Sequence, residues 1–286
     1  NPTEQLSHDE FKTNAYAAFG SAEYEFSDAL KLSAALRYDR EERRVNNLVD
    51  PTLRNQFVLG GNAPLNVGLL NGGTLVPQSR TFDQLQPKVS LLFKPSSDWS
   101  LYGDWGIGFK SGGFNNQGSR AAIDLTYNQA VGSNLRIRDN FEKERSSAFE
   151  AGFKGRLLGG RLTIEGAGYY TDISDMQFFE FYVGNFGILR VVSNIDKVRI
   201  YGAELGINWR VASWLSLYTS GNVNDSKIIR NSARPNTAGG DAPYTADYTL
   251  NFGGDLNAPI NDQLTFTART DVRVTGPTWF HTSQTS

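Results

Sequence analysis

The chain has 286 residues, a formal net charge of −2, 39% hydrophobic residues and no cysteine. The absence of cysteine excludes disulfides, thiolate metal ligands and cysteine nucleophiles. The near-neutral charge offers no electrostatic footprint for nucleic acid, so we expect no nucleic-acid partner. No run of eighteen apolar residues is present, which excludes a membrane-spanning helix.

Residues 30–41 alternate between mostly apolar even positions and mostly polar odd positions, and residues 263–275 repeat this pattern. Successive side chains of a strand point to opposite faces, so each segment has one apolar and one polar face. These segments run about twelve residues, against a usual strand length of about five or six. A tilted strand that crosses a bilayer needs this length.

The alternation continues through ten segments, joined in pairs by short turns and between pairs by long links. The segments are about 13–26, 30–43, 84–94, 99–110, 145–157, 161–173, 198–210, 215–225, 244–256 and 263–275. The short turns are 27–29, 95–98, 158–160, 211–214 and 257–262, and the long links are 44–83, 111–143, 174–197 and 226–243. Short turns on one side and long loops on the other are typical of a transmembrane antiparallel up-and-down β-barrel.

A soluble β-sandwich also alternates and is the competing interpretation. The position of the aromatic side chains favours the barrel, since two bands of rings suit two membrane interfaces. One group lies at the short-turn ends: Tyr24, Phe26, Phe93, Trp99, Trp209 and Trp214. The other lies toward the long links: Tyr16, Tyr38, Phe109, Tyr170, Tyr201 and Tyr248.

Local motifs add a resemblance that covers nearly the whole chain. Residues 108–115 (GFKSGGFN) resemble the barrel of TonB-dependent receptors, as do residues 149–154 (FEAGFK) and 169–177 (YYTDISDMQ). Residues 193–198, 201–205 and 242–246 match later strands of that family in order and spacing. The resemblance implies TonB-energised import of a scarce substrate, most often an iron–siderophore complex and less often cobalamin or an oligosaccharide.

Such receptors have about twenty-two strands, an internal plug and an N-terminal box that engages TonB, and the motifs matched here belong to the barrel alone. We therefore expect residues 1–286 to be a partial barrel domain, with both ends as cuts, in a Gram-negative outer membrane. The expected partners are outer-membrane lipids, a small-molecule ligand such as a metal chelate, and TonB through an N-terminal region that precedes this chain. A passive pore or a structural or adhesive barrel without energy coupling is the alternative, and a soluble all-β enzyme or lectin is a third.

No catalytic, metal or cofactor site is expected. Residues 106–111 (GIGFKS) approach a dinucleotide fingerprint, but 112–118 do not supply the helix that it needs. We expect these glycines to allow tight bends and close backbone approach at the barrel rim. A catalytic triad or histidine metal site would have to use His8 or His281, and neither has a partner at motif spacing.

The weak candidates for ligand contact fall in two places. Phe178, Phe179 and Tyr182 lie in an aromatic run within a long link, where they would offer stacking surface; a continued strand in the wall is the favoured interpretation. Arg43 and Arg44 lie at the base of the first long link, where they would meet an anionic ligand or form a solvated rim.

The period of two also predicts which side chains face lipid. We expect one face to carry Leu32, Leu36, Phe266 and Val272 toward lipid. We expect the other to carry Glu23, Glu25, Lys31, Arg37, Asp39, Glu41, Arg269 and Arg273 toward the lumen.

Overall fold

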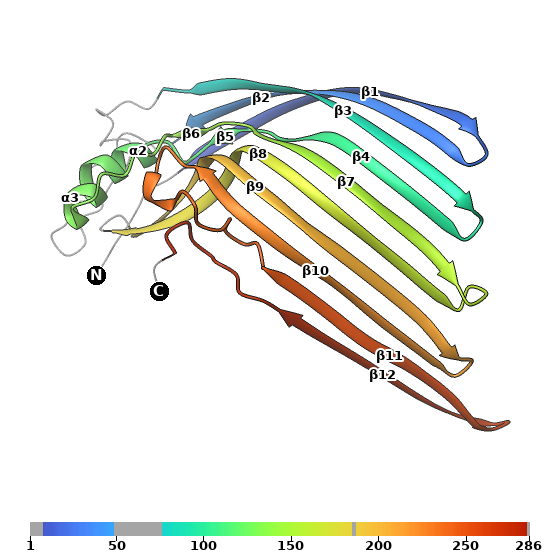
Figure 1. Cartoon of the computed structure of the whole chain (residues 1–286). Helices are drawn as coiled ribbons and strands as arrows, with labels where there is room; N and C mark the ends of the chain where they lie inside the picture. The colour runs from blue at the N-terminus through green and yellow to red at the C-terminus, as the bar shows by residue number, and fades with distance from the viewer. Residues whose placement is uncertain (1–7, 49–75, 185–186, 285–286) are drawn as a thin grey trace.

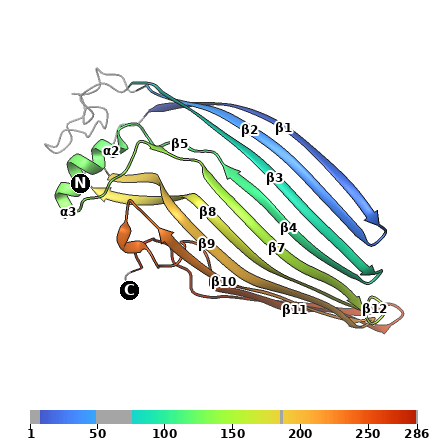
Figure 2. The ribbon, with the colours of Figure 1, turned by 45° about the horizontal axis from the view of Figure 1, so that its top comes forward.

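The computed structural model describes residues 8–48, 76–184 and 187–284, and it consists of one open, curved antiparallel sheet (Figures 1 and 2). Its ten strands follow one another in chain order, with β1 and β12 at the two edges. The strands are β1 (Asp9–Ser27), β2 (Leu30–Asn47), β3 (Gln78–Ser96), β4 (Trp99–Lys110), β7 (Glu144–Leu157), β8 (Leu162–Gly184), β9 (Gly187–Ala212), β10 (Leu215–Arg230), β11 (Tyr248–Asn261) and β12 (Leu264–Thr275). This confirms the predicted up-and-down barrel wall.

The five short turns all lie at one end of the sheet (Figure 1). Four match their predicted positions closely, whereas β11 continues to Asn261, so the predicted turn at 257–262 is shorter than expected. In the third turn Leu158, Gly159 and Gly160 all have positive φ, at 54°, 64° and 81°. Two of the three are glycine, the residue that adopts this conformation without a steric penalty.

The opposite end of the sheet, which we call the loop end, carries the long connections. Most of the predicted link 44–83 lies outside the described residues. The link 111–143 forms a folded insertion made of β5 (Gly113–Phe114), α2 (Ser119–Ala122), the π-helix η2 (Ile123–Tyr127), α3 (Asn128–Val131) and β6 (Asn140–Phe141). β5 pairs with β6, which closes the base of the insertion. The link between β10 and β11 includes the short 3₁₀-helix η3 (Pro235–Thr237).

The prediction of a loop at residues 174–197 is wrong. β8 runs to Gly184 and β9 begins at Gly187, and the two stay in register throughout this region, from Ser174 opposite Lys197 to Gly184 opposite Gly187. The aromatic run 176–183 is therefore a continued strand, as the favoured interpretation had it. Strands of 23 and 26 residues far exceed the 9–11 that cross a bilayer, so this hairpin extends well beyond the rest of the wall.

A backbone irregularity explains why alternation did not reveal this extension. Asp175 has φ 55°, in the left-handed region, in the middle of β8. Ile173 and Phe178 are five residues apart and would face opposite sides of a regular strand, yet both pack in one cluster with Ile195 and Val198. The strand thus exchanges its two faces at Asp175.

The strand register confirms that the predicted sets of side chains lie on two separate faces. Leu32 lies opposite Tyr24 on β1 and Leu91 on β3, and Phe266 lies opposite Ala258. Rings of both aromatic bands lie on this apolar face, as the pairs Trp209–Leu217, Tyr38–Leu85 and Tyr170–Tyr201 show. A wall with aliphatic residues between two aromatic bands is the lipid-facing pattern of membrane barrels.

The other face carries the charges, and many of them pair with one another. Lys31 lies 2.5 Å from Glu23, Arg37 2.6 Å from Asp39, and Arg269 2.9 Å from Asp271. The 111–143 insertion contacts this same face, since Arg80 on β3 binds Glu142 at 2.8 Å. The polar face is therefore the one on which the insertion folds. None of the helices in the described ranges is long and apolar enough to cross a membrane.

Candidate functional site

The loop end is held together by side-chain amides that join the insertion to the β8–β9 hairpin. Asn115 is 5% exposed, and its Nδ2 donates to the carbonyls of Arg138 (2.9 Å) and Val192 (2.8 Å). The Val192 amide donates back to Asn115 Oδ1 at 2.7 Å. One buried side chain thus satisfies three backbone groups that have no partner in the sheet ladder.

Two further amides repeat this arrangement on either side. Asn194 on β9 accepts from the Glu142 amide (2.7 Å) and donates to the carbonyls of Glu142 (3.0 Å) and Asp175 (2.8 Å). Gln177 on β8 donates to the carbonyls of Ser111 (2.8 Å) and Glu142 (3.1 Å). Both ends of the insertion are therefore fixed to the hairpin.

Apolar packing completes this attachment. Ala122, Ile123 and Ile137 of the insertion form a buried cluster with Tyr182 on β8 and with Leu189 and Val191 on β9. The glycines at the base allow the close approach predicted for them. A Cβ on Gly112 would lie 2.3 Å from the Phe82 ring and 2.5 Å from the Phe141 carbonyl oxygen, so only glycine fits there.

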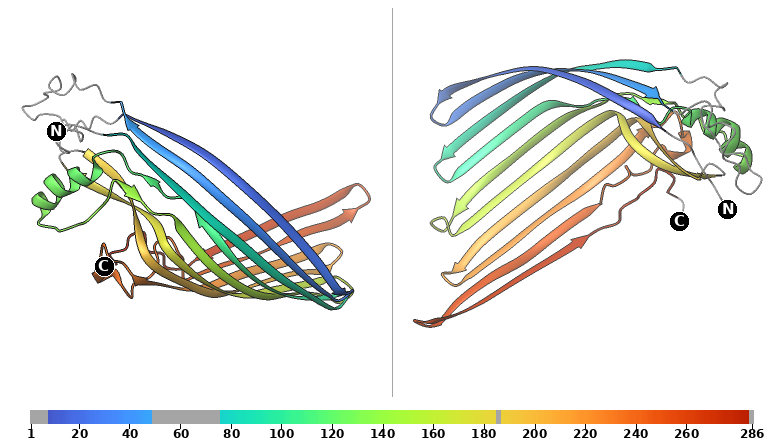
Figure 3. Two further views of the ribbon diagram at one scale, coloured as in Figure 1. Left: turned by 90° about the horizontal axis from the view of Figure 1, so that it is seen from above. Right: turned by 180° about the vertical axis from the view of Figure 1, so that it is seen from behind.

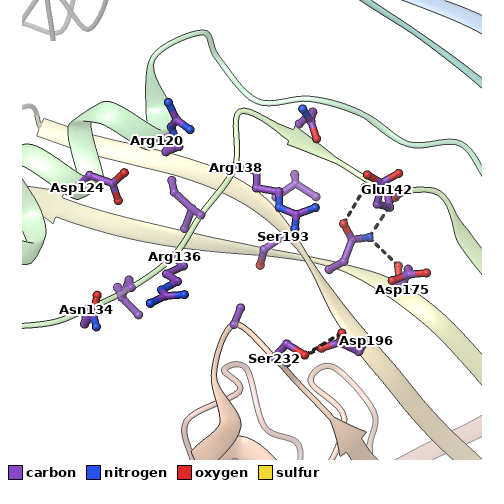
Figure 4. A pocket seen from close by; sticks show the side chains of 16 residues that line it. Arg120, Asp124, Asn134, Arg136, Arg138, Glu142, Asp175, Ser193, Asp196 and Ser232 are labelled. Carbon is purple, nitrogen blue, oxygen red and sulfur yellow. Dashed lines mark hydrogen bonds between the residues drawn. The ribbon is translucent and has the colours of Figure 1, made fainter. Parts of the chain in front are cut away.

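Between the insertion, the hairpin and the segment after β10 lies a cavity of about 700 Å³ (Figure 4). This volume is within the range of small-molecule sites, roughly 300–1,000 Å³. Its lining is mostly polar and charged. It includes Arg120, Asp124, Asn134, Arg136, Arg138, Glu142, Asp175, Ser193, Asn194, Asp196 and Ser232.

Two of the four carboxylates that line this cavity are engaged by groups of the protein. Glu142 forms a two-pronged contact with Arg80 at 2.8 and 3.2 Å. Asp196 accepts hydrogen bonds from the amide and the hydroxyl of Ser232. Partial burial, together with the nearby Asp196 and Glu142 carboxylates, raises the pKa of Asp175 above its usual value.

The arginines of the cavity are not engaged in this way. Within the described ranges, Arg120, Arg136 and Arg138 have no carboxylate within 4.0 Å of their guanidinium nitrogens. Figure 4 shows all three on the insertion side of the cavity, with Asp196 and Ser232 on the opposite side. These residues were not singled out in the sequence, although the Arg-Ile-Arg spacing at 136–138 puts two cations on one side of an extended segment.

A second polar cluster surrounds Glu180, whose side chain is only 4% exposed. Arg234 Nη2 lies 2.7 Å from Glu180 Oε2, and the Tyr182 hydroxyl donates to the same oxygen at 2.7 Å. His281 Nε2 and the Thr282 hydroxyl approach the other oxygen at 3.3 Å each. Burial is the main cause that raises the pKa of Tyr182, which therefore stays a hydrogen-bond donor.

His281 has partners that its neighbours in the sequence do not reveal. Besides Glu180, the ring contacts Ser283, whose amide and hydroxyl both approach Nδ1, at 3.1 and 2.7 Å. The Ser283 N–H donates to His281 Nδ1 within a local turn. It is therefore not available to stabilise an oxyanion at Ser283. The contacts join three loop-end segments structurally. No group of His, Asp and Glu suited to a metal ion occurs in the described part of the chain.

The aromatic candidates occupy three different environments. Phe178 and Tyr182 are 3% and 4% exposed and belong to the two apolar clusters of the loop end. Phe179 lies on the opposite face of β8, stacked on Tyr244 with centroids 5.8 Å apart and with Arg190 4.6 Å above its ring. Ligand contact by these three residues remains a prediction, and in this structure protein groups cover the rings of Phe178 and Tyr182.

The two basic candidates, Arg43 and Arg44, both lie on β2 but point to opposite faces of the sheet. Arg43 shares the polar face with Arg37 and contacts Glu41 at 2.8 Å, directly across from Arg80. Arg44, one residue later, points to the opposite face and is exposed. A ligand in the lumen would therefore reach Arg43 but not Arg44.

A wall with a lipid-type face, a charged inner face and a folded insertion at one end defines an incomplete membrane β-barrel. The chain matches the family model "TonB dependent receptor-like, beta-barrel" over residues 1–285. It therefore belongs to the TonB-dependent receptor family.

Solved structures agree on the fold. The ferric yersiniabactin uptake receptor FyuA from Yersinia pestis aligns with a TM-score of 0.68 and 18% identity, over 96% of this chain and 36% of that one. The siderophore receptor PiuA from Acinetobacter baumannii aligns with a TM-score of 0.60 and 15% identity, over 91% and 33%. The copper transporter OprC aligns with a TM-score of 0.58 and 19% identity, over 85% of this chain and 32% of that one. The chain spans about a third of the length of these structures.

Proposed function

We propose that the intact protein is a receptor in the outer membrane of a Gram-negative bacterium and imports an iron–siderophore complex with energy supplied through TonB. Residues 1–286 form part of its barrel domain. The family match over 1–285 carries this proposal. The proposal assigns no bond-making step to this chain, in keeping with a family of transporters and receptors.

The two faces of the wall support the assignment of partners. The apolar face contacts outer-membrane lipids, and the charged face borders the path of the substrate. TonB engages the receptor through an N-terminal region that precedes this chain. The loop-end cavity, fixed by three amides and an apolar cluster, is where a ligand arriving from outside first meets the protein.

Uptake of radioactive iron chelates by cells that carry the full-length receptor tests this function. We expect accumulation that requires both the receptor and TonB. Uptake that persists unchanged without TonB would indicate a passive pore. No receptor-dependent uptake of any chelate would indicate a structural or adhesive barrel, and either result contradicts the proposal.

A further inference from the structure

The insertion presents two guanidinium groups on a rigid backbone. Residues 134–138 form an extended arm in which Leu135 and Ile137 pack toward the buried cluster of the loop end, and Arg136 and Arg138 alternate with them. Asn128 Nδ2 donates to the Leu135 carbonyl at 2.9 Å, and Asn115 Nδ2 holds the Arg138 carbonyl at the same distance. The arm is therefore held at Leu135 and at Arg138, while the side chains of Arg136 and Arg138 stay exposed.

Four other arginines near the polar face form close ion pairs, whereas these arginines do not. Arg37, Arg43, Arg80 and Arg269 each lie within 3.0 Å of a carboxylate. Arg136 and Arg138, together with Arg120 on α2 of the same insertion, have no such partner in the part of the chain described. Of the four carboxylates that line the cavity, Glu142 is bound by Arg80 and Asp196 by Ser232, and none lies within 4.0 Å of a guanidinium nitrogen of these three arginines.

The remaining lining indicates what kind of anion fits. No aromatic side chain lines the cavity among the described residues, whereas Asn134, Ser193 and Ser232 add short polar groups. The nearby rings of Phe178 and Tyr182 are turned into apolar clusters. A catecholate chelate gains from stacking on aromatic faces, whereas carboxylate groups gain from two-pronged hydrogen bonds with guanidinium.

We propose that this cavity selects metal chelates whose charge is carried by aliphatic carboxylate groups, with Arg136 and Arg138 as the principal contacts and Arg120 as a third. This inference rests on the proposed function, because it takes the ligand to be an anionic metal chelate. It adds which chelate chemistry is bound and which residues distinguish it.

The test uses the full-length receptor, purified in detergent and titrated with ferric citrate and, separately, with a ferric tris-catecholate. We expect ferric citrate to bind the wild type more tightly. Replacing both arginines (R136Q/R138Q) should weaken ferric citrate binding about 100-fold, or about tenfold for each lost charged hydrogen bond. The double variant R161Q/R210Q, which removes the same charge at the short-turn end, should leave the affinity unchanged.

Circular dichroism and heat-dependent gel migration confirm that both variants are folded before titration. Tighter binding of the catecholate, no binding of ferric citrate, or equal ferric citrate affinity in the wild type and R136Q/R138Q would each overturn the inference. TonB-dependent uptake of the catecholate alone would leave the proposed function standing while removing this selectivity. Uptake that no longer depends on TonB, together with arginine-dependent binding of ferric citrate, would contradict the proposed function and leave the selectivity of the cavity standing.

Discussion

The wall and the loop end of this molecule are built on different principles. In the wall few side chains are buried, and in β12, an edge strand of the sheet, all twelve residues are exposed. At the loop end, most of the buried apolar side chains of the described residues gather in two clusters, and buried amides bind the elements together. The wall depends on an external apolar solvent, whereas the loop end carries its own core.

The views in Figure 3 show this division in space, with the strands ending in short turns at one end and the insertion folded at the other. A substitution in the wall should therefore change stability through lipid contact, whereas one at the loop end should change it through local packing. The following changes separate these two kinds of stability.

The largest effect is expected at the buried ion pair of the loop end. Replacing Arg234 with alanine leaves the Glu180 carboxylate, 4% exposed, without its cation, which costs about 3–5 kcal/mol for a buried pair. Hydrogen exchange of residues 178–182 in the full-length receptor should accelerate accordingly. Arg230→Ala is the matched control, because Arg230 lies 3.9 Å from Asp196 and is 71% exposed, so its loss should cost at most about 1 kcal/mol. Equal acceleration in both variants would contradict a self-contained loop-end core.

The next effect tests the faces of the wall. Leu36→Arg places a cation on the apolar face between the aromatic bands and should cost about 2–4 kcal/mol in folding assays of the full-length receptor. Arg37→Leu, its neighbour on the polar face, should cost less, because Gln86 still donates to Asp39 at 2.5 Å. Equal tolerance of the two substitutions would refute the assignment of faces.

A smaller effect is expected from the amide that fixes the insertion. Asn115→Ala removes bonds to Arg138 and Val192 and should cost about 1–3 kcal/mol, the range for buried groups left unsatisfied. Exchange at residues 187–195 reports this loss. Asn134→Ala, an exposed amide at the edge of the same cavity, should leave exchange unchanged. An unchanged rate in Asn115→Ala would show that the apolar cluster alone holds the insertion.

The smallest effect concerns Asp175 and depends on pH. Burial and the nearby carboxylates raise its pKa in the folded protein, so its ionised form destabilises the fold above the ordinary Asp pKa of about 4. Asp175→Asn removes that charge and keeps a residue that tolerates φ 55°. We expect slower exchange at residues 173–177 than in the wild type at pH 7, with the difference vanishing as pH falls below about 4. Faster exchange at pH 7 would contradict this account.

The sequence predicted the wall well because one rule, the alternation of faces in a lipid-spanning strand, determines the face of each wall residue, such as Leu32 on β2 and Val272 on β12. It predicted the loop end poorly for three physical reasons. Asp175 exchanges the faces of β8, so the aromatic run beyond it shows no simple period. The helices α2 and α3 have four residues each and no apolar repeat. The amide of Asn115 binds a residue 77 positions away, a contact that no local pattern encodes.

The central claim is that the loop end faces the cell exterior and the short turns face the periplasm. Because residues 1–286 contain no cysteine, single cysteines at Gln129 in α3 and at Asp28 in the first short turn would report this directly in a full-length receptor from which any cysteine elsewhere has been replaced. Both positions are exposed. A membrane-impermeant maleimide applied to whole cells that carry the full-length receptor should label position 129 and spare position 28. Labelling of position 28 but not position 129 would invert the topology and remove the ligand-capturing role of the loop-end cavity.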